Sequence, residues 1–537
     1  MPLAPPGNPL ANIGDRDMPS AADPASAKKI CVIGAGVAGL ATAKVFLSQG
    51  HAVTVFEKVD TLGGVWSPAR RYPGVRLQTR RQHYAFSDFP MPPHYPEFPT
   101  GQQVYEYLCA YAARFGVDRA IRFRTEVRSV VPRPDSLPGW RVQVRDLATG
   151  GDTASDFDFV VVCNGVFSEP DIPLFSGRNE FEARGGIVLH SSQVSDAAIL
   201  NGRDVVVVGF GKSALDLAEA SLATARSTAI VCRRVPWKVP HRLGRANIKY
   251  FILTRFTEIW FPHPDMGRWR RALHTWLRPV VDLYWRAAEF VIGRKLGLFS
   301  PELRPDVPLR KSTPCVTLAL DNLRLIRDGK VALHRGSVAR FIAGGLELQD
   351  GRTIAAQVVV LATGYRRGFR FLRERERAAL YDPSGAILLY RALINPDIPD
   401  MAFNGYNGVG VCQIAAEVGA TWLVECIEGR VQLPERAAML DTIRQELDLR
   451  RRLLSTPVDD GAYVTPFTFG YLDQLLRDLG LPPADQHRRR FDWLFTPLDP
   501  ADYRDLIARG ATARLHDTID RPLRLDERET QLETSPP

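Results

Sequence analysis

The chain has 537 residues, of which 45% are hydrophobic and 24% are charged, and its formal net charge is +9. This length and composition are typical of a globular protein with two to four domains and large cores. The positive charge is spread along the chain without a recognition motif, which argues against a nucleic-acid partner and favours attraction of anionic cofactors. The seven cysteines include no C-x-x-C pair, so we expect reduced thiols in a cytoplasmic protein.

The first structural unit follows a tail. Residues 1–28 are rich in Pro and Ala without an apolar run, which predicts disorder rather than a signal peptide. From Lys29 the sequence is typical of a buried strand, a glycine turn, a helix that ends at Gly50, and a second strand that ends at Glu57, just before Lys58. The turn is a complete G-x-G-x-x-G, made of Gly34, Ala35, Gly36, Val37, Ala38 and Gly39.

The three glycines have separate roles in a dinucleotide-binding unit. Gly34 permits the tight turn, Gly36 lets a pyrophosphate approach the backbone, and Gly39 lets the helix pack close to the strand. Glu57 lies 18 residues after Gly39, where an acid can accept hydrogen bonds from both ribose hydroxyls. The unit therefore predicts a site for a dinucleotide with a free ribose, which we interpret as FAD.

A second unit of the same kind starts at Val205. Its turn consists of Gly209, Phe210, Gly211, Lys212, Ser213 and Ala214, with alanine at the third small position. Its second strand ends in Arg233 and Arg234 and carries no acid. Arg233 lies 24 residues after Gly209 and Glu57 lies 23 residues after Gly34, so we expect these two side chains at equivalent positions. Guanidinium groups can clasp a 2′-phosphate, which predicts NADPH; the alternative is a solvated strand end.

Seven motifs occur in an order that resembles the class B flavoprotein monooxygenases, which include the flavin-containing and the Baeyer–Villiger monooxygenases. They are GAGVAG, GGVW, YAFSDFP, CNG, GFGKSA, RRVPWKVP and LATGY, between about residue 29 and residue 515. The resemblance implies an α/β fold of two Rossmann-like domains, with an NADPH domain inserted in an FAD domain. It also implies cofactor contacts from Gly64, Val65, Trp66, Gln78, Val127, Asn164, Gly165, His190, Thr363, Gly364 and Tyr365.

Two places bear on the subgroup, and the second of them favours the flavin-containing enzymes. The segment Arg184–Val194 keeps Gly186, His190 and Ser191 of the signature of that subgroup, without its aromatic ends and without the Baeyer–Villiger extension. By resemblance, Gln78 stands where flavin-containing enzymes usually have Asn and Baeyer–Villiger enzymes usually have Asp. An amide can orient a flavin adduct or the nicotinamide without forming an ion pair, so we predict Gln78 as the catalytic position. For His190 we expect an architectural or cofactor role and no proton transfer.

A third place departs from the family. Residues 415–422 resemble its E-x-Q-A-R-W helix, but Gly419 replaces the Gln and Thr421 replaces the Arg. This difference predicts an active-site rim that differs from that of the drug-oxidising enzymes.

The NADPH domain is expected to be inserted between two segments of the FAD domain. We predict FAD-domain segments at 29–195 and 323–525, the second of them with C-terminal helices, an NADPH domain at 196–322, and a tail at 526–537. A helical insertion at about 245–312 contains a helix from Pro279 to about Lys295. Its expected apolar face consists of Val280, Tyr284, Ala288 and Val291. Basic residues outnumber acidic ones seven to two between Arg268 and Lys295. The segment 249–297 is therefore either a lid packed on the core, which we favour, or a peripheral membrane contact.

The resemblance implies a monooxygenase that depends on NADPH and O2. In this scheme NADPH reduces FAD, the reduced flavin forms a C4a-(hydro)peroxyflavin with O2, and a nitrogen or sulfur nucleophile of a small apolar substrate takes one oxygen. Baeyer–Villiger oxidation of a ketone and an NADPH oxidase or flavin reductase without oxygen insertion remain alternatives. No clustered His/Cys motif indicates a metal. The oligomeric state is not predicted.

Overall fold

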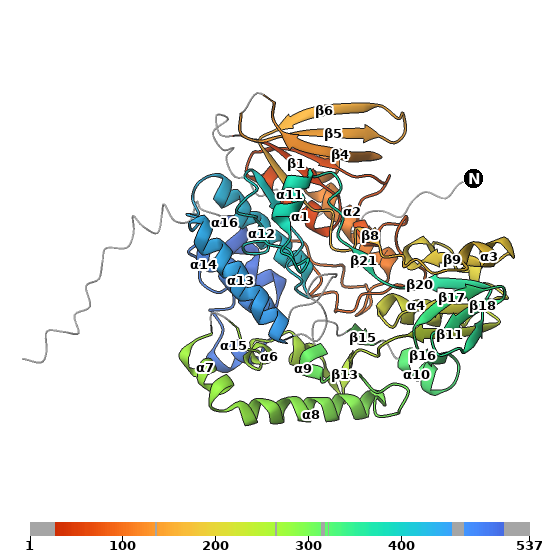
Figure 1. Cartoon of the computed structure of the whole chain (residues 1–537). Helices are drawn as coiled ribbons and strands as arrows, with labels where there is room; N and C mark the ends of the chain where they lie inside the picture. The colour runs from red at the N-terminus through yellow and green to blue at the C-terminus, as the bar shows by residue number, and fades with distance from the viewer. Residues whose placement is uncertain are drawn as a thin grey trace, which may run out of the picture.

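The computed structural model describes residues 27–134, 137–263, 266–312, 317–319, 322–453 and 467–509 (Figure 1). Almost all of the expected N-terminal tail, and the whole tail at 526–537, lie outside these residues. None of the helices in the described ranges has an apolar stretch that could span a bilayer.

The first Rossmann domain is built on a five-stranded parallel sheet. Its strand order is β22-β7-β1-β2-β3. The strands are β1 (Lys29–Ile33), β2 (Ala52–Phe56), β3 (Ile121–Arg122), β7 (Phe159–Val162) and β22 (Met401–Phe403). A meander of β4 (Thr125–Pro132), β5 (Trp140–Asp146) and β6 (Asp152–Phe157) separates β3 from β7. Because β1 and β7 are buried on both faces, they consist of continuous apolar runs.

Three helices cover this sheet. Helix α1 (Val37–Ser48) packs against α12 (Cys412–Ile427), and the apolar side chains of both belong to the largest core. Helix α2 (Gly101–Arg114) starts in a capping box, because the Thr100 hydroxyl accepts from the backbone N–H of Gln103 and the Gln103 side chain accepts from that of Thr100.

The second domain repeats the topology of the first. Its parallel sheet has the order β16-β11-β10-β20-β9. The strands are β9 (Ile187–His190), β10 (Asp204–Val208), β11 (Ser227–Cys232), β16 (Ala332–Arg335) and β20 (Val358–Leu361). A second meander, β17 (Val338–Ile342), β18 (Gly345–Leu348) and β19 (Thr353–Ala355), separates β16 from β20, as β4–β6 separates β3 from β7. Helices α3 (Arg178–Ala183), α4 (Lys212–Ser221) and α10 (Asn322–Arg327) belong to this unit.

The domain boundaries differ from those expected at residues 195 and 322. Strand β9 precedes residue 195, and β16, the second meander and β20 follow residue 322, yet all pair within the second domain. The chain crosses between the domains at β8 (Glu169–Pro170) and β21 (Tyr365–Arg366), which form a two-stranded antiparallel ribbon. The expected insertion of one domain in the other is confirmed. The inserted domain begins earlier in the chain than residue 196 and ends later than residue 322. A valine-rich run indicates a buried strand but not which of two similar sheets it joins.

The segment after β11 contains short strands and five helices. Strands β12 (Lys238–Pro240) and β15 (Thr317–Ala319) pair in parallel, and β13 (Arg242–Leu243) pairs with β14 (Ala246–Asn247). The helices are α5 (Lys249–Ile252), α6 (Arg255–Ile259), α7 (Arg268–Thr275), α8 (Arg278–Leu296) and α9 (Leu309–Ser312). The C-terminal part consists of α11 (Glu374–Leu380), α13 (Arg436–Leu453), α14 (Thr468–Asp478), α15 (Arg490–Phe495) and α16 (Arg504–Arg509), besides α12.

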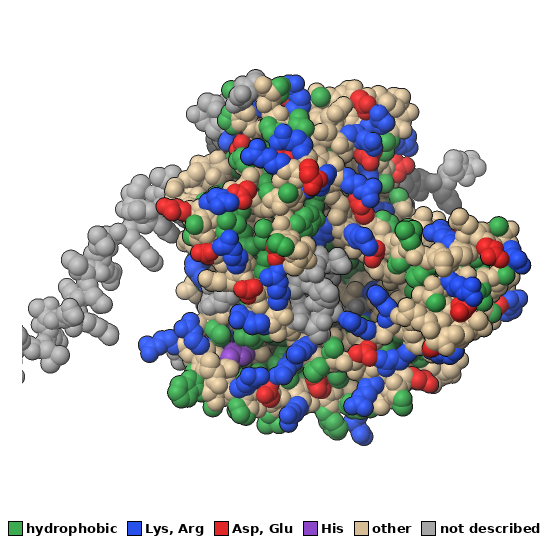
Figure 2. Space-filling view, in the orientation of Figure 1, with side chains coloured by type: hydrophobic (Ala, Val, Ile, Leu, Met, Phe, Trp, Pro, Cys, Tyr) green, Lys and Arg blue, Asp and Glu red, His purple; other side chains and the backbone are tan. Residues whose placement is uncertain are grey.

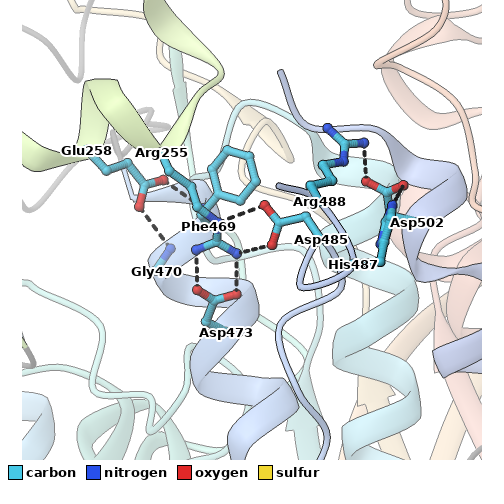
Figure 3. A network of polar contacts seen from close by, with 9 residues as sticks. All are labelled: Arg255, Glu258, Phe469, Gly470, Asp473, Asp485, His487, Arg488 and Asp502. Atoms are coloured by element: carbon cyan, nitrogen blue, oxygen red, sulfur yellow. Dashed lines mark hydrogen bonds and ion pairs between the residues drawn. The ribbon is translucent and has the colours of Figure 1, made fainter. Parts of the chain in front are cut away.

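Figure 3 shows how this segment is fixed to the C-terminal helices. Arg255 of α6 binds the carboxylates of Asp473 and Asp485, with 2.9 Å from its Nη2 to Asp473 Oδ1 and 2.7 Å to Asp485 Oδ1. Glu258 accepts from the backbone N–H groups of Phe469 (2.7 Å) and Gly470 (2.9 Å) in the first turn of α14, where the helix dipole favours an anion. Burial nevertheless raises the pKa of Glu258 to about 7. These polar contacts anchor the segment on the molecule.

Helix α8 is present as expected, but its buried face is different. The side chains that pack on the core of the second domain are Val281, Trp285 and Ile292. Val280 and Val291 of the expected face are exposed, while Tyr284 and Ala288 contact the core at its edge. Apolar residues occur on two sides of α8, so periodicity alone could not identify the inner one. The packing agrees with a lid on the protein core.

Candidate dinucleotide-binding active site

The first glycine turn has the geometry that its sequence predicts. Gly34 has φ +104°, and a Cβ on it would lie 2.8 Å from the carbonyl oxygen of Cys163, the residue after β7. On Gly39 a Cβ would lie 1.9 Å from the carbonyl oxygen of Gly34, so α1 packs directly on the turn. A Cβ on Gly36 would lie 3.6 Å from the Cα of Gly64, which is ordinary van der Waals contact without a clash. The backbone there fits a pyrophosphate at the start of a helix.

Glu57 closes this turn from the neighbouring strand. One of its carboxylate oxygens accepts from the backbone N–H of Ala35 (2.9 Å) and the other from that of Val59 (3.1 Å). Its side chain is buried, while Lys58 beside it is exposed. Each carboxylate oxygen has a further lone pair, so the Glu57 carboxylate can still accept from a ribose hydroxyl.

The GGVW motif lies directly against the first turn. The backbone N–H of Gly63 donates to the carbonyl oxygen of Ala35 at 2.8 Å, and a Cβ on Gly64 would be 3.1 Å from the Cα of Gly36. Val65 is partly exposed, and the Trp66 indole N–H donates to the Tyr84 hydroxyl at 2.9 Å. A side chain at Gly64 would therefore crowd the backbone of the first turn at Gly36.

The second glycine turn repeats the first, with one polar addition. A Cβ on Gly209 would lie 2.4 Å from the carbonyl oxygen of Ala362, and none of the described atoms is within 4 Å of one on Gly211. Lys212 forms an ion pair with Asp216 one helical turn along α4, and the Tyr72 hydroxyl donates to the same carboxylate at 3.0 Å. Ser213 follows Lys212, and Ala214 is fully buried where the first turn has Gly39. Lys212 is therefore partly neutralised by Asp216.

Strand register corrects the equivalence expected between Glu57 and Arg233. Ile33 pairs with Phe56 in the first sheet, and Val208 pairs with Val231 in the second. The residue opposite Gly34 is therefore Glu57, whereas the residue opposite Gly209 is Cys232. Burial raises the pKa of Cys232 to about 11, so a neutral thiol occupies the position of the acid.

The two arginines follow one and two residues later than Cys232. Arg233 and Arg234 are both exposed, and within the described ranges no carboxylate forms an ion pair with either. By contrast, Lys238 is buried, and its ammonium group donates to the carbonyl oxygen of Phe210 at 2.7 Å. Two free guanidinium groups beside an uncharged position suit a phosphorylated ribose better than a free one.

Each sheet places a second glycine beside its turn. In the first sheet the motif CNG follows β7, and in the second ATG of LATGY follows β20, at the same register. Gly165 (φ +77°) and Gly364 (φ +97°) both have open space where a Cβ would be. Asn164 is held by its own contacts, donating to the carbonyl oxygen of Gly368 at 2.6 Å and accepting from the Tyr406 hydroxyl.

His190 joins β9 to this second glycine motif. It is buried, its Nε2 lies 3.0 Å from the carbonyl oxygen of Gly364, and its Nδ1 lies 2.8 Å from the Ser192 hydroxyl. Its ring packs edge-on against Tyr365, and the Thr363 hydroxyl donates to the carbonyl oxygen of Asp171 at 2.5 Å. Burial lowers the pKa of His190. These contacts are those of an architectural residue.

The loop that carries Gln78 runs between the two domains. Tyr72 and Gly74 lie against α4 of the second domain, and the Leu77 N–H donates to the carbonyl oxygen of Pro99 in the first. Gln78 is half-buried at the end of this crossing. Val127 lies on β4, where the pairing with β5 shifts register between Val127 and Ser129. Contact of these residues with a cofactor stays a prediction.

The departure at residues 415–422 lies in the interior of the protein. Gly419 and Thr421 are on the buried helix α12, where the Thr421 hydroxyl donates to the carbonyl oxygen of Glu417. Glu417 itself accepts from the backbone N–H of Ser87 at 2.8 Å. These side chains are part of the core against α1, and the effect of the two replacements on an active-site rim stays a prediction.

Comparisons with known proteins agree with this site. The profile of the Flavin-binding monooxygenase-like family matches residues 27–261. A relative from Arabidopsis thaliana, named "Probable flavin-containing monooxygenase 1", is 30% identical over 531 residues, covering 91% of this chain and 98% of its own length. The chain belongs to the flavin-containing monooxygenase family. It is an FAD-dependent monooxygenase of the NADPH-using type, and its two cofactors are FAD and NADPH.

Solved structures show the same fold at low identity. The S-allyl-L-cysteine S-oxygenase from Allium sativum has a TM-score of 0.58 and 18% identity, with 92% of this chain and 94% of that chain covered. A steroid monooxygenase in its oxidised form, bound to NADP, has a TM-score of 0.60 and 20% identity, with 91% and 98% covered. The expected α/β fold of two Rossmann-like domains is thereby confirmed.

Sequence reasoning missed two features of the site. Cys232 lies 23 residues after Gly209, the same spacing as Glu57 after Gly34, so an exact count from the glycine turn could have revealed it. The expectation accepted a spacing of 24 because a charged residue, Arg233, stands there. The contact between Tyr72 and Asp216 joins residues 144 positions apart, and no local pattern marks it.

Proposed function

We propose that this flavin-containing monooxygenase uses NADPH and O2 to oxygenate a nitrogen or sulfur nucleophile of a small, largely apolar molecule. Within the described residues, the first turn with Glu57 suits FAD, and the second with Cys232, Arg233 and Arg234 suits NADPH. Bound together, these cofactors supply hydride transfer and oxygen activation. The chain itself supplies placement and polarity.

The observation that carries the choice of nucleophile is the side chain at position 78. Gln78 is half-buried on the loop that runs between the two domains. Its amide both donates and accepts hydrogen bonds and cannot form an ion pair. Both ring nitrogens of His190 contact groups of the protein, which supports an architectural role for this residue. An amide at position 78, in place of a carboxylate, suits direct oxygen transfer to a soft nucleophile.

An apolar substrate fits the lid position that we propose for α8. Trp285 and Val281 of α8 pack on the protein core, and Tyr284 stacks on Trp260 with ring centroids 4.0 Å apart, so the inner face of this helix is apolar. For the cell we propose a cytoplasmic location, since the six described cysteines are all free thiols.

Product analysis tests the proposal against its two rivals. Purified enzyme with NADPH is offered an aryl sulfide, a tertiary amine and a cyclic ketone under ¹⁸O2. We expect labelled sulfoxide or N-oxide as the main product. A labelled lactone as the main product would favour Baeyer–Villiger oxidation instead. Hydrogen peroxide in amounts equal to the NADPH consumed, without labelled organic product, would identify an oxidase.

A further inference from the structure

The outer side of α8 is an exposed apolar stripe. While Val281, Trp285 and Ile292 face inward, Val280, Leu283, Phe290 and Val291 are between 46% and 67% exposed. On a helix with 3.6 residues per turn, Leu283, Ala287 and Phe290 lie in one row. Single exposed apolar residues are ordinary on a protein surface, but a row along a helix marks an interaction site.

Aromatic residues extend this stripe at both ends. Trp276 and Leu277, at the corner between α7 and α8, are 85% and 54% exposed. Trp269 on α7 is 60% exposed, and Phe299, just after α8, is 55% exposed. In Figure 1, α7 and α8 lie along the lower edge of the molecule, with nothing drawn beyond them. We call α7, α8 and Phe299 the basal face.

The basal face is also strongly basic. Five of its cationic side chains are exposed and have no ion-pair partner among the described residues: Arg268, Arg271, Arg286, Arg294 and Lys295. Both acidic side chains of the basal face interact with residues of α9. Asp282 pairs with Arg310, and Glu289 accepts from the backbone N–H of Leu309 at 2.7 Å. Figure 2 shows blue and green side chains interleaved along this edge.

We propose that the basal face docks on the surface of an anionic phospholipid bilayer. A helix with an apolar stripe and basic flanks lies in the plane of such a surface, its apolar side chains among the acyl chains and its cations at the phosphates. Tryptophan and long basic side chains are the residues that favour this interface. The inference goes beyond the proposed oxygenation and does not depend on it.

Charge complementarity selects the bilayer over a second copy of the chain. Two basal faces packed together would bring the same five cations of each copy into one interface, which repels at ordinary ionic strength. A bilayer with anionic headgroups neutralises them instead. Docking would place the lid against the membrane, the phase in which an apolar substrate concentrates.

Vesicle co-sedimentation of the full-length holoenzyme tests the proposal. The vesicles are phosphatidylcholine alone, or phosphatidylcholine with phosphatidylglycerol. We expect the protein to sediment with the anionic vesicles. Binding to neutral vesicles, and binding to anionic vesicles at high salt, should each be weaker by about tenfold or more. Equal binding to both vesicles, or none to either, would overturn the proposal.

Two variants and a matched control locate the contact. Leu283→Asp should weaken binding to anionic vesicles about tenfold or more, because a carboxylate enters the apolar layer. Arg286→Gln with Arg294→Gln should weaken it and reduce its salt dependence. Leu174→Asp is the control, since Leu174 is fully exposed on the loop after β8. Flavin content and NADPH oxidation should match wild type in all three.

Equal loss in Leu283→Asp and Leu174→Asp would overturn the placement on α8. A concentration-dependent dimer that Leu283→Asp abolishes, without vesicle binding by wild type, would show a self-association face instead. Binding that requires an acidic protein and is absent on every vesicle would likewise contradict the bilayer.

Discussion

Cys232 occupies in the second Rossmann sheet the position that Glu57 occupies in the first. In each sheet the residue before the glycine turn pairs with the residue before this position, Ile33 with Phe56 and Val208 with Val231. A carboxylate suits a ribose with free hydroxyls, and it would repel a 2′-phosphate. The change from Glu to a buried neutral thiol removes that repulsion, and the guanidinium groups of Arg233 and Arg234 then add attraction.

Introducing the acid should reverse the preference of the second site. In Cys232→Glu, the carboxylate would face the 2′-phosphate, so KM for NADPH should rise about tenfold or more while KM for NADH changes little. Steady-state oxidation of both nucleotides measures this. Cys232→Ser keeps a small neutral side chain and should behave as wild type. An equal rise of both KM values in Cys232→Glu would contradict the assignment.

Removing the guanidinium groups of Arg233 and Arg234 should weaken binding of the 2′-phosphate of NADPH. Charged hydrogen bonds are worth about 1.5–3 kcal/mol each, so Arg233→Ala with Arg234→Ala should raise KM for NADPH by roughly tenfold or more. KM for NADH should change far less. Arg119→Ala, an exposed arginine of the first domain, serves as control. Loss of NADH and NADPH use to the same extent would refute a role in phosphate binding.

Side chains on the second glycine of each turn should separate the two cofactors. Gly36→Val places methyl groups in the space of the FAD pyrophosphate, and we expect a colourless protein. Gly211→Val places methyl groups in the space of the NADPH pyrophosphate at the second turn. That variant should keep its FAD and stay yellow, but NADPH should not reduce its flavin. Absorbance per chain and anaerobic reduction measure both. A fully flavinated Gly36→Val protein would show that FAD binds elsewhere.

The glycine turns could be predicted from sequence because their requirements are local. Gly34, Gly39 and Gly209 face neighbouring backbone at distances that only glycine accepts, and each such position leaves its mark in a short motif. The acid at Glu57 and the arginines at 233 and 234 follow strands of predictable length.

The pairing of strands that are far apart in the sequence could not be predicted in the same way. Val160–Val162 and Val358–Val360 are alike as sequence, and only the paired register places the first beside β1 and the second beside β10. On α8, Val280 and Val281 are identical in type, yet the first is exposed and the second is buried.

Glu417 should make the folded protein sensitive to pH. Burial raises the pKa of Glu417 from 4.5 to about 7, against the opposing effect of Lys44. The stability this group contributes is full below about pH 4.5 and is lost as the pH rises through about 7, a difference of about 3 kcal/mol at most. Glu417→Gln should therefore flatten the fall of Tm between about pH 5 and pH 8.

The exposed Glu435 provides the control for this titration, because Glu435→Gln should leave the pH profile of Tm unchanged. Thermal unfolding at a series of pH values gives the comparison. If the slope of Tm against pH is unchanged in Glu417→Gln, the Glu417 carboxyl does not titrate in this range. Lys44, which forms ion pairs with both Asp88 and Glu417, is present in both proteins.

The central claim is that one polypeptide holds FAD at Glu57 and receives hydride from NADPH at Cys232, Arg233 and Arg234. The most direct test is an anaerobic titration of the purified protein, followed by flavin absorbance. We predict a yellow protein that one equivalent of NADPH bleaches, at concentrations where NADH does so far more slowly. A colourless protein that takes up no added FAD, or a bound flavin that NADPH does not reduce, would contradict it.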